Sequence, residues 1–256
     1  MRKAILALLT ALIALALVLS AYTLTSRNEA DPADIDAVVR QAHKQSGGDQ
    51  EQERGLRPAP GTYVYVGRGS DSVDALGGST HTYAHKVPLV VKLGDDCEWS
   101  YEVTFVQQHV ERHTYCTTAS SLRHVAIDQE VEFFRTTEKT HLSCSKRAFR
   151  LAAGSKQGEQ WSYSCAGDKR RLEYIATYMG EERLTIGSAR VPARHVRLKN
   201  TLSGVTTGRE TLDFWYARSG LPLRFETDID VQSESVLGDT KYTDHASYTL
   251  SSTKPR

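Results

Sequence analysis

Alternation of apolar and polar residues dominates the chain from Gly61 onward. In Cys97–Phe105, apolar side chains at every second position are separated by Ser100, Glu102 and Thr104. A period of two places alternate side chains on opposite faces of a β-strand. The segments predicted to be strands are short and rich in aromatic and β-branched residues; the others lie at 62–66, 87–93, 131–135, 161–165, 172–178, 184–186, 195–198, 212–216, 221–229 and 242–250.

The connections between these segments are short. Glycine beside Asp, Ser or Thr marks expected turns at 94–96, 187–188, 207–208, 219–220 and 238–239. Short connections require antiparallel pairing, because parallel strands need long crossovers. We therefore predict an all-β domain over residues 61–253. It is expected to be one large curved antiparallel sheet, forming a barrel or half-barrel, with a sandwich as the alternative.

The pattern is different ahead of the strands. Residues Ala4–Leu24 form an apolar run, and its 21 residues would span about 31 Å as a helix, the thickness of a bilayer core. Arg2 and Lys3 precede it, which predicts a cytoplasmic N-terminus and an exported remainder. We expect residues 1–27 to be a single-pass transmembrane signal-anchor in the cell membrane. A cleaved signal peptide is the alternative and would make the protein secreted; either way the β domain is extracytoplasmic.

Residues 28–60 are expected to link the anchor to the β domain. Asp31 and Pro32 have the character of a helix start, and apolar residues follow at positions 35, 38, 39 and 42, on one helical face. This predicts a short amphipathic helix of about 32–45. The segment from Gln45 to Pro60 is rich in Gly, Gln, Pro and charge, which favours a flexible stalk.

Four cysteines follow the apolar run: Cys97, Cys116, Cys144 and Cys165. Their spacing contains no C-x-x-C, which excludes a zinc ribbon and a thioredoxin-like redox motif. In an exported chain, disulfides are expected. Three connectivities are possible. We favour Cys97–Cys116 with Cys144–Cys165, because each bond would join neighbouring segments of a meander and contribute roughly 3 kcal/mol.

The charge balance excludes a dedicated nucleic-acid binder. The chain has 32 Lys and Arg against 31 Asp and Glu, a net charge of +1. Three local basic clusters are interrupted by acidic residues, and we expect them to lie on a solvated sheet face or in turns. They are Lys146-Arg147, Lys169-Arg170-Arg171 and the group Arg194, Arg197 and Lys199.

The C-terminal third contains the most recognisable sequence pattern of the chain. Gly180–Gly187 precedes Val191–Arg197, and the aromatic run Asp213–Tyr216 turns through Ser219-Gly220 into Leu221-Pro222-Leu223. This arrangement resembles the edge of extracytoplasmic half-barrel proteins and is similar to the lipoprotein-carrier (LolA-like) family. That resemblance implies a lipid-carrying half-barrel with helices across its open mouth, and we find no helical segment here for that position.

The chain as a whole resembles uncharacterised membrane-anchored extracytoplasmic β proteins of actinobacteria. The resemblance rests on the anchor, the Pro-containing stalk, the Tyr-rich first strand Gly61–Tyr65 and the two cysteine-bounded segments. It covers most of residues 60–250.

Candidate chemistry is sparse. No nucleophile elbow, zinc-protease, P-loop, dinucleotide or EF-hand motif occurs. Histidines on one strand face are the main candidates: His109 and His113 with Glu111 between them, and His81 and His85 with Tyr83. They could hold zinc, but exposed histidines of a polar sheet face are the favoured interpretation. His195 is expected to be structural or exposed, and Asp228 and Asp230, although spaced like glycosidase carboxylates, to lie on a polar strand face.

We therefore predict no catalytic, cofactor or metal residues, and only the four disulfide cysteines as special positions. The expected function is non-enzymatic binding of a hydrophobic or amphipathic envelope molecule by the concave face of the sheet. One alternative is a structural or interaction module that docks another envelope protein; a hydrolase is the third. Expected partners are the bilayer, through one helix, and a lipid or an envelope protein, with no nucleic acid.

Overall fold

The structure is a computed structural model that describes residues 30–45, 57–145, 150–152, 154–168, 170–204, 206–235 and 238–256. These residues form an α-helix, α2 (Ile35–Gln45), a short 3-10 turn, η1 (Ala75–Gly77), and a 14-stranded sheet. The strands are β1 (Gly61–Val73), β2 (Ser79–Thr82), β3 (Lys86–Leu93), β4 (Glu98–Val106), β5 (His109–Thr118), β6 (Ser121–Phe133), β7 (Thr136–Cys144), β8 (Arg150–Ala152), β9 (Gln160–Ala166), β10 (Arg170–Ile186), β11 (Ala189–Gly204), β12 (Thr206–Tyr216), β13 (Pro222–Ser235) and β14 (Gly238–Leu250).

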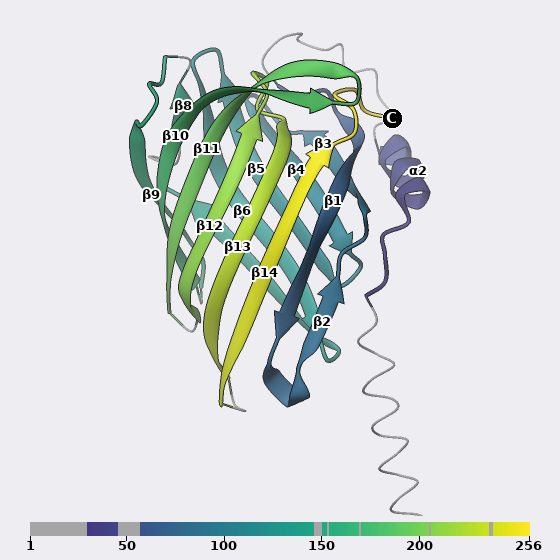
Figure 1. The fold of residues 1–256 in the computed structure, drawn as a ribbon, viewed down its shortest axis with the longest axis vertical. Coiled ribbons are helices and arrows are strands. Elements are labelled where there is room, and N and C mark those ends of the chain that lie inside the picture. Colours follow the sequence, from purple (N-terminus) through teal and green to yellow (C-terminus); the bar gives the residue numbers. More distant parts are fainter. Residues whose placement is uncertain are drawn as a thin grey trace, which may run out of the picture.

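The sheet closes on itself as an antiparallel barrel (Figure 1). Strands pair in chain order, and β14 returns to pair with β1 from Tyr65 to Val73. Both β2 and β3 pair along β1, and both β7 and β8 pair along β6, so the barrel has 12 strand positions. The prediction of an all-β domain is confirmed, with the barrel as the form the sheet takes.

The N-terminal predictions are described only in part. Helix α2 begins at Ile35, because the Asp34 carboxylate accepts a hydrogen bond from the Ala37 amide at 3.0 Å and caps the first turn. The helix lies outside the barrel wall beside β1 and β3 (Figure 1). Within the residues that the structure describes, no helix combines the length and apolarity needed to cross a bilayer. The predicted anchor at 1–27 and the stalk residues 46–56 lie outside them.

Two expected turns are wrong. Thr207 and Gly208 lie inside β12, and Gly238 and Asp239 begin β14. Gly208 has φ +138°, and a Cβ there would lie 2.6 Å from the carbonyl oxygen of Asp230 on the neighbouring strand. The glycine at this position therefore permits a close approach of two strands and does not mark a turn.

The upper end of the barrel in Figure 1, where β14 ends, is covered by the tip of the β10–β11 hairpin. The predicted strands 172–178 and 184–186 are parts of one long strand, β10, which bends at a bulge between Tyr178 and Gly180. Gly180 adopts φ +116°, a conformation that favours glycine. Beyond the bend, Leu184 and Ile186 are buried. A hairpin thus covers the mouth where the carrier resemblance implied helices.

The upper half of the barrel is filled by large aromatic side chains whose polar atoms are paired. Tyr65 is fully buried and donates to the Pro222 carbonyl at 2.7 Å, and the Trp99 indole donates to Thr117 Oγ1 at 2.8 Å. Burial of aromatic groups with satisfied hydrogen bonds stabilises the domain core and closes this half to ligands.

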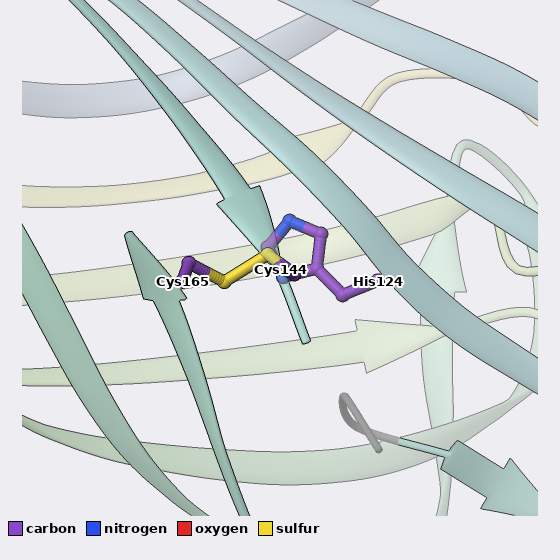
Figure 2. A group of neighbouring side chains, drawn as sticks. All are labelled: His124, Cys144 and Cys165. Atoms are coloured by element: carbon purple, nitrogen blue, oxygen red, sulfur yellow. A yellow bond between two sulfur atoms is a disulfide. The ribbon is translucent and has the colours of Figure 1, made fainter. Parts of the chain in front are cut away.

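The barrel wall has a weak place between β7 and β9. Within the described residues, β7 and β9 pair only through Ser143–Ala166 and Cys144–Cys165, and the second pair is also a disulfide; directly after it, the Ser145 amide donates to the Ser164 carbonyl at 2.8 Å. Figure 2 shows this disulfide with His124 of β6 beside it. We call this junction the β7–β9 seam. The other disulfide joins Cys97 to Cys116 beside the β4–β5 ladder, so both bonds follow the pairing of neighbouring segments favoured from the sequence.

Candidate functional site

The barrel interior holds a cavity of about 300 Å³ that opens at the lower end. A barrel of 8 strands is just wide enough for its own side chains to fill, so 12 strands leave space. The cavity wall has an apolar band, formed by Val73, Val131, Phe133, Leu202, Ile229 and Val231, and polar side chains surround the opening, at Thr136, Thr206, Ser233, Glu234 and Thr240. Polar side chains gather deeper, at Gln129, Thr140, Arg170 and Glu210, which we call the cavity floor. A smaller inner chamber of about 70 Å³ continues beyond the floor.

Arg170 corrects one prediction. We expected the cluster around it to be solvated, but its side chain points into the cavity and is 17% exposed. It donates to Gln129 Oε1 at 3.2 Å and to Glu138 Oε1 at 3.3 Å. Its neighbour Arg171 faces outward, as strand alternation requires. Arg170 therefore supplies the positive charge of the floor and crosses from β10 to β6 and β7 beside the seam.

Glu210 is the floor residue with the most unusual electrostatics. Burial raises its pKa to about 7, and a hydrogen bond from Asn200 and the charge of Arg170 offset only part of that effect. The Asn200 amide donates to Glu210 Oε2 at 2.6 Å. The other end of that amide, Asn200 Oδ1, is buried and has no hydrogen-bond partner among the described residues. Asn200 does not line the cavity, so the floor presents the Glu210 carboxylate as the acceptor that a ligand donor could reach.

Replacing Glu210 by glutamine is expected to stabilise the protein in a pH-dependent way. Between pH 4.5, the ordinary pKa of the group, and about 7, the folded native protein holds a proton that the unfolded chain loses, so native stability falls as pH rises. The E210Q variant lacks this loss. We expect it to exceed the native free energy of unfolding by about 3 kcal/mol at pH 8 and to match it at pH 4. Urea denaturation at both pH values measures this, and a pH-independent difference would contradict it.

A second polar group lies in the wall beside the inner chamber and is almost completely buried. It consists of Asp71, His81, Tyr83, His109 and Asp244, which we call the His109 network. His109 Nδ1 lies 2.9 Å from Asp71 Oδ2 and 2.8 Å from the Tyr83 hydroxyl. Tyr83 also donates a short hydrogen bond to Asp244 Oδ2. His81 Nδ1 lies 2.9 Å from Asp71 Oδ1.

Burial and ion pairing act against each other in this network. Burial alone would lower the pKa of His109, but its contacts with Asp71 and Glu111 outweigh that effect and raise the pKa to about 10. Burial raises the pKa of Asp244 to about 6. For Asp71, burial favours a higher pKa, but His109 and His81 hold it below the ordinary value. At neutral pH the network therefore contains a histidinium between carboxylates.

Glu111 connects the network to the inner chamber. Its carboxylate lies 3.3 Å from His109 Nε2 and 3.7 Å from His113 Nε2. Burial would raise its pKa, but the two histidines lower it well below the usual range. The sequence correctly placed these three side chains on one strand face, but the expectation that the histidines are exposed is wrong, because that face is the barrel interior.

The second predicted histidine group is only half present. His81 and Tyr83 share the interior, whereas His85 is exposed and its ring contacts the Gly67 carbonyl at 2.9 Å. The strand is interrupted between β2 and β3, at residues 83–85, so the alternation does not continue to His85. His124 is also buried, and burial holds its pKa well below the ordinary value. The cystine beside it has no thiolate to offer a metal.

Two other candidate sites, His195 and the pair Asp228 and Asp230, lie on the outer face. His195 contacts Asp213 at 2.6 Å and Glu182 at 3.0 Å, and its ring stacks on Trp215. These contacts fit the structural role expected for His195.

Asp228 and Asp230 lie on the same outer face of β13. Each contacts its own partner on β14: Asp228 lies 3.1 Å from His245 and Asp230 lies 2.9 Å from Lys241. Both side chains are more than half exposed. The polar strand face predicted for them is what the structure has.

The sequence reasoning missed Asp71, Glu210 and Asp244. Each lies on an alternating strand whose other inward positions are apolar or small; Glu210, for example, lies two positions before Leu212 and four before Phe214. An acidic residue in phase with buried apolar residues was the available signal.

No protein-family model matches this chain, and no curated protein matches it in sequence. Among solved structures, the crystal structure of the hypothetical lipoprotein YmcC from Escherichia coli K12 is similar over 76% of this chain and 91% of that chain. The sequence identity is 8% and the TM-score is 0.33. The likeness to LolA-like carriers stays a prediction.

Proposed function

We propose that this protein is a non-enzymatic binding protein of the cell envelope, which holds an amphipathic molecule in the barrel cavity. The observation that carries the proposal is the cavity itself: about 300 Å³, with an apolar band in its wall and polar side chains at its floor. Small-molecule sites are concave and mainly apolar, and contain a few convergent polar groups. A lipid-like molecule with a polar head would meet both environments.

The floor favours a head group that donates hydrogen bonds. Glu210 offers a carboxylate acceptor at the floor, whereas Arg170 is already engaged by Gln129 and Glu138. Burial of this carboxylate costs free energy, and a ligand amine or hydroxyl that donates to it would recover part of that cost. The head group of the ligand is therefore proposed to be an amine or a hydroxyl, with its alkyl part toward the opening.

The chain ahead of the barrel is fixed near the open end. The Gln107 amide donates to the Asp31 carbonyl at 2.8 Å, and the Asp31 amide donates to Gln108 Oε1 at 3.0 Å. Gln107 and Gln108 form the β4–β5 turn, which lies at the lower end. If residues 1–27 anchor the protein as proposed, the cavity opens toward the membrane. The two disulfides fit an oxidising, extracytoplasmic location for this domain.

Filling the cavity tests the proposal. Ile229 lines both the cavity and the inner chamber, so the I229F variant is expected to occupy ligand space with little effect on the fold. The probe is N-phenyl-1-naphthylamine, an apolar N–H donor whose fluorescence rises in apolar surroundings. We expect saturable binding to the native chain and an affinity at least tenfold lower in I229F. Dodecylamine should displace the probe at lower concentration than dodecanoate does.

The matched control is Ile175 on the outer face, which is 49% exposed. The I175F variant adds the same atoms to a strand without reaching the cavity, and its probe affinity should equal the native value. Thermal unfolding of both variants checks their folding. Equal probe affinity in native, I229F and I175F proteins would overturn the proposal, as would the absence of saturable binding to the native chain.

A further inference from the structure

We propose that Asp71, His109 and Asp244 form a binding site for a divalent transition-metal cation, with Zn²⁺ as the representative ion. The site lies inside the barrel wall, between β1, β5 and β14, and goes beyond the amphiphile-binding function. One histidine nitrogen and two carboxylates are a donor set that zinc uses commonly. All three residues are buried, and their candidate ligand atoms lie within 4.8 Å of one another.

The distances between the ligand atoms suit a small ion. His109 Nδ1 lies 2.9 Å from Asp71 Oδ2 and 3.9 Å from Asp244 Oδ2. Ligands at zinc's bond lengths around a tetrahedron would be about 3.4 Å apart, and the two observed separations lie on either side of that value. Side-chain shifts of about half an ångström would bring the three atoms to ligand distances. The Tyr83 hydroxyl, which now bridges His109 and Asp244, would give up that position.

Two neighbouring polar atoms give an independent indication of a missing partner. Asp71 Oδ1 and His81 Nδ1 are buried and lie 2.9 Å apart as an ion pair, but the contact lacks good hydrogen-bond geometry, and neither atom has another hydrogen-bond partner in the described part of the chain. Both residues are no more than 2% exposed. Buried polar atoms normally make well-aligned hydrogen bonds, so both atoms retain bonding capacity for an ion. An ion bound to Asp71 would satisfy its second oxygen, and His81 is placed to supply a further nitrogen.

The surroundings also provide the orienting contacts that metal ligands need. Glu111 Oε1 lies 3.3 Å from His109 Nε2, so it can hold the imidazole proton on that nitrogen and leave Nδ1 free for the ion. Thr227 donates to Asp244 Oδ1 at 2.7 Å and fixes that carboxylate. On binding, the proton shared at His109 Nδ1 leaves to solvent, and the charge of the ion balances the two carboxylates.

The donor set and the position point to the class of ion and its route. A mixed nitrogen and carboxylate site favours zinc and related transition metals over calcium or magnesium, which prefer oxygen ligands. Asp244 and Glu111 both line the inner chamber, and that chamber adjoins the open cavity through the floor. An ion can therefore reach the site from the lower end of the barrel.

Cobalt titration of the full chain, monitored by absorption spectroscopy, tests the site, because Co²⁺ substitutes for Zn²⁺ and is coloured when bound. We expect one equivalent of Co²⁺ to give visible absorption bands that Zn²⁺ abolishes. The D244N variant should bind Co²⁺ at least tenfold more weakly. Its control is D228N, which changes an aspartate that also lies beside a histidine, His245, but on the outer face. D228N should titrate like the native chain.

A second variant keeps the test valid if D244N does not fold. Y83F removes the bridging hydroxyl but retains the ring that stacks on Phe105, and it should bind Co²⁺ at least as tightly as the native chain. Zn²⁺ should also raise the unfolding temperature of native, Y83F and D228N proteins. No absorption bands with the native chain, or identical titrations of native and folded D244N proteins, would overturn the proposal. Loss of amphiphile binding in I229F leaves these results unchanged, so the two proposals fail separately.

Discussion

Replacing both Cys144 and Cys165 by alanine is expected to lower the free energy of unfolding by at least about 3 kcal/mol and to open the barrel at the β7–β9 seam. The bond closes a loop with a sequence separation of 21, which accounts for about 3 kcal/mol in the chain-entropy model. The structural effect comes in addition, because in the described residues only the backbone pairs at 143–166 and 144–165 and the hydrogen bond from the Ser145 amide to the Ser164 carbonyl would then join the two segments. Urea denaturation measures the stability, and amide hydrogen exchange of β7 and β9 measures the opening.

The other disulfide provides a matched control. Cys97–Cys116 has a sequence separation of 19, so its removal costs nearly the same loop entropy. There, however, β4 and β5 stay joined by their ladder from Glu98 to Val106. The C97A/C116A variant should lose similar stability while β4 and β5 keep their exchange protection. Equal protection of β7 and β9 in native and seam variants would contradict the prediction.

The second large effect is expected from Asp71→Ala. The Asp71 carboxylate is fully buried between His81 and His109, each 2.9 Å away. Removing it leaves the charge of His109 without its closest partner in a dry interior, and breaking a buried ion pair in this way costs about 3–5 kcal/mol. Thermal and urea unfolding in the presence of a metal chelator should show this loss.

An exposed pair of the same residue types serves as the comparison. Asp228 lies 3.1 Å from His245, but its side chain is 73% exposed. Water and salt screen such a pair, so Asp228→Ala should change the free energy of unfolding by less than about 0.5 kcal/mol. If the two variants lose equal stability, the His109 network is not the source of the effect.

The class of fold could be read from the sequence because strand alternation is a local signal. Positions such as Trp99, Tyr101, Val103 and Phe105 alternate in the sequence and are buried in the structure. Closure of the barrel could not be read in this way, since the pairing of β1 with β14 joins residues from opposite ends of the domain. Whether a curved sheet closes depends on strand number and stagger, which a single sequence does not encode locally.

The site was harder to predict than the fold for a related reason. Alternation showed that His109, Glu111 and His113 share one face of a strand. Because all three are polar, we expected that face to be the outer one. The interior of a wide barrel can accept polar side chains where they pair with one another, as Glu111 does with both histidines. Asp71 and Asp244, the partners of His109, come from β1 and β14, and only the closed barrel brings them to that histidine.

The bend of β10 and β11 over one end also determines how the contents of the barrel could be exchanged. Because that end is covered, a bound molecule has to leave through the opening by which it entered, and the next molecule can enter only after it has left. The rate of exchange would then be set by the dissociation rate of the bound molecule, since the next molecule cannot enter by the covered end. A molecule must therefore be delivered and removed at the same open end, where the chain ahead of the barrel is also attached.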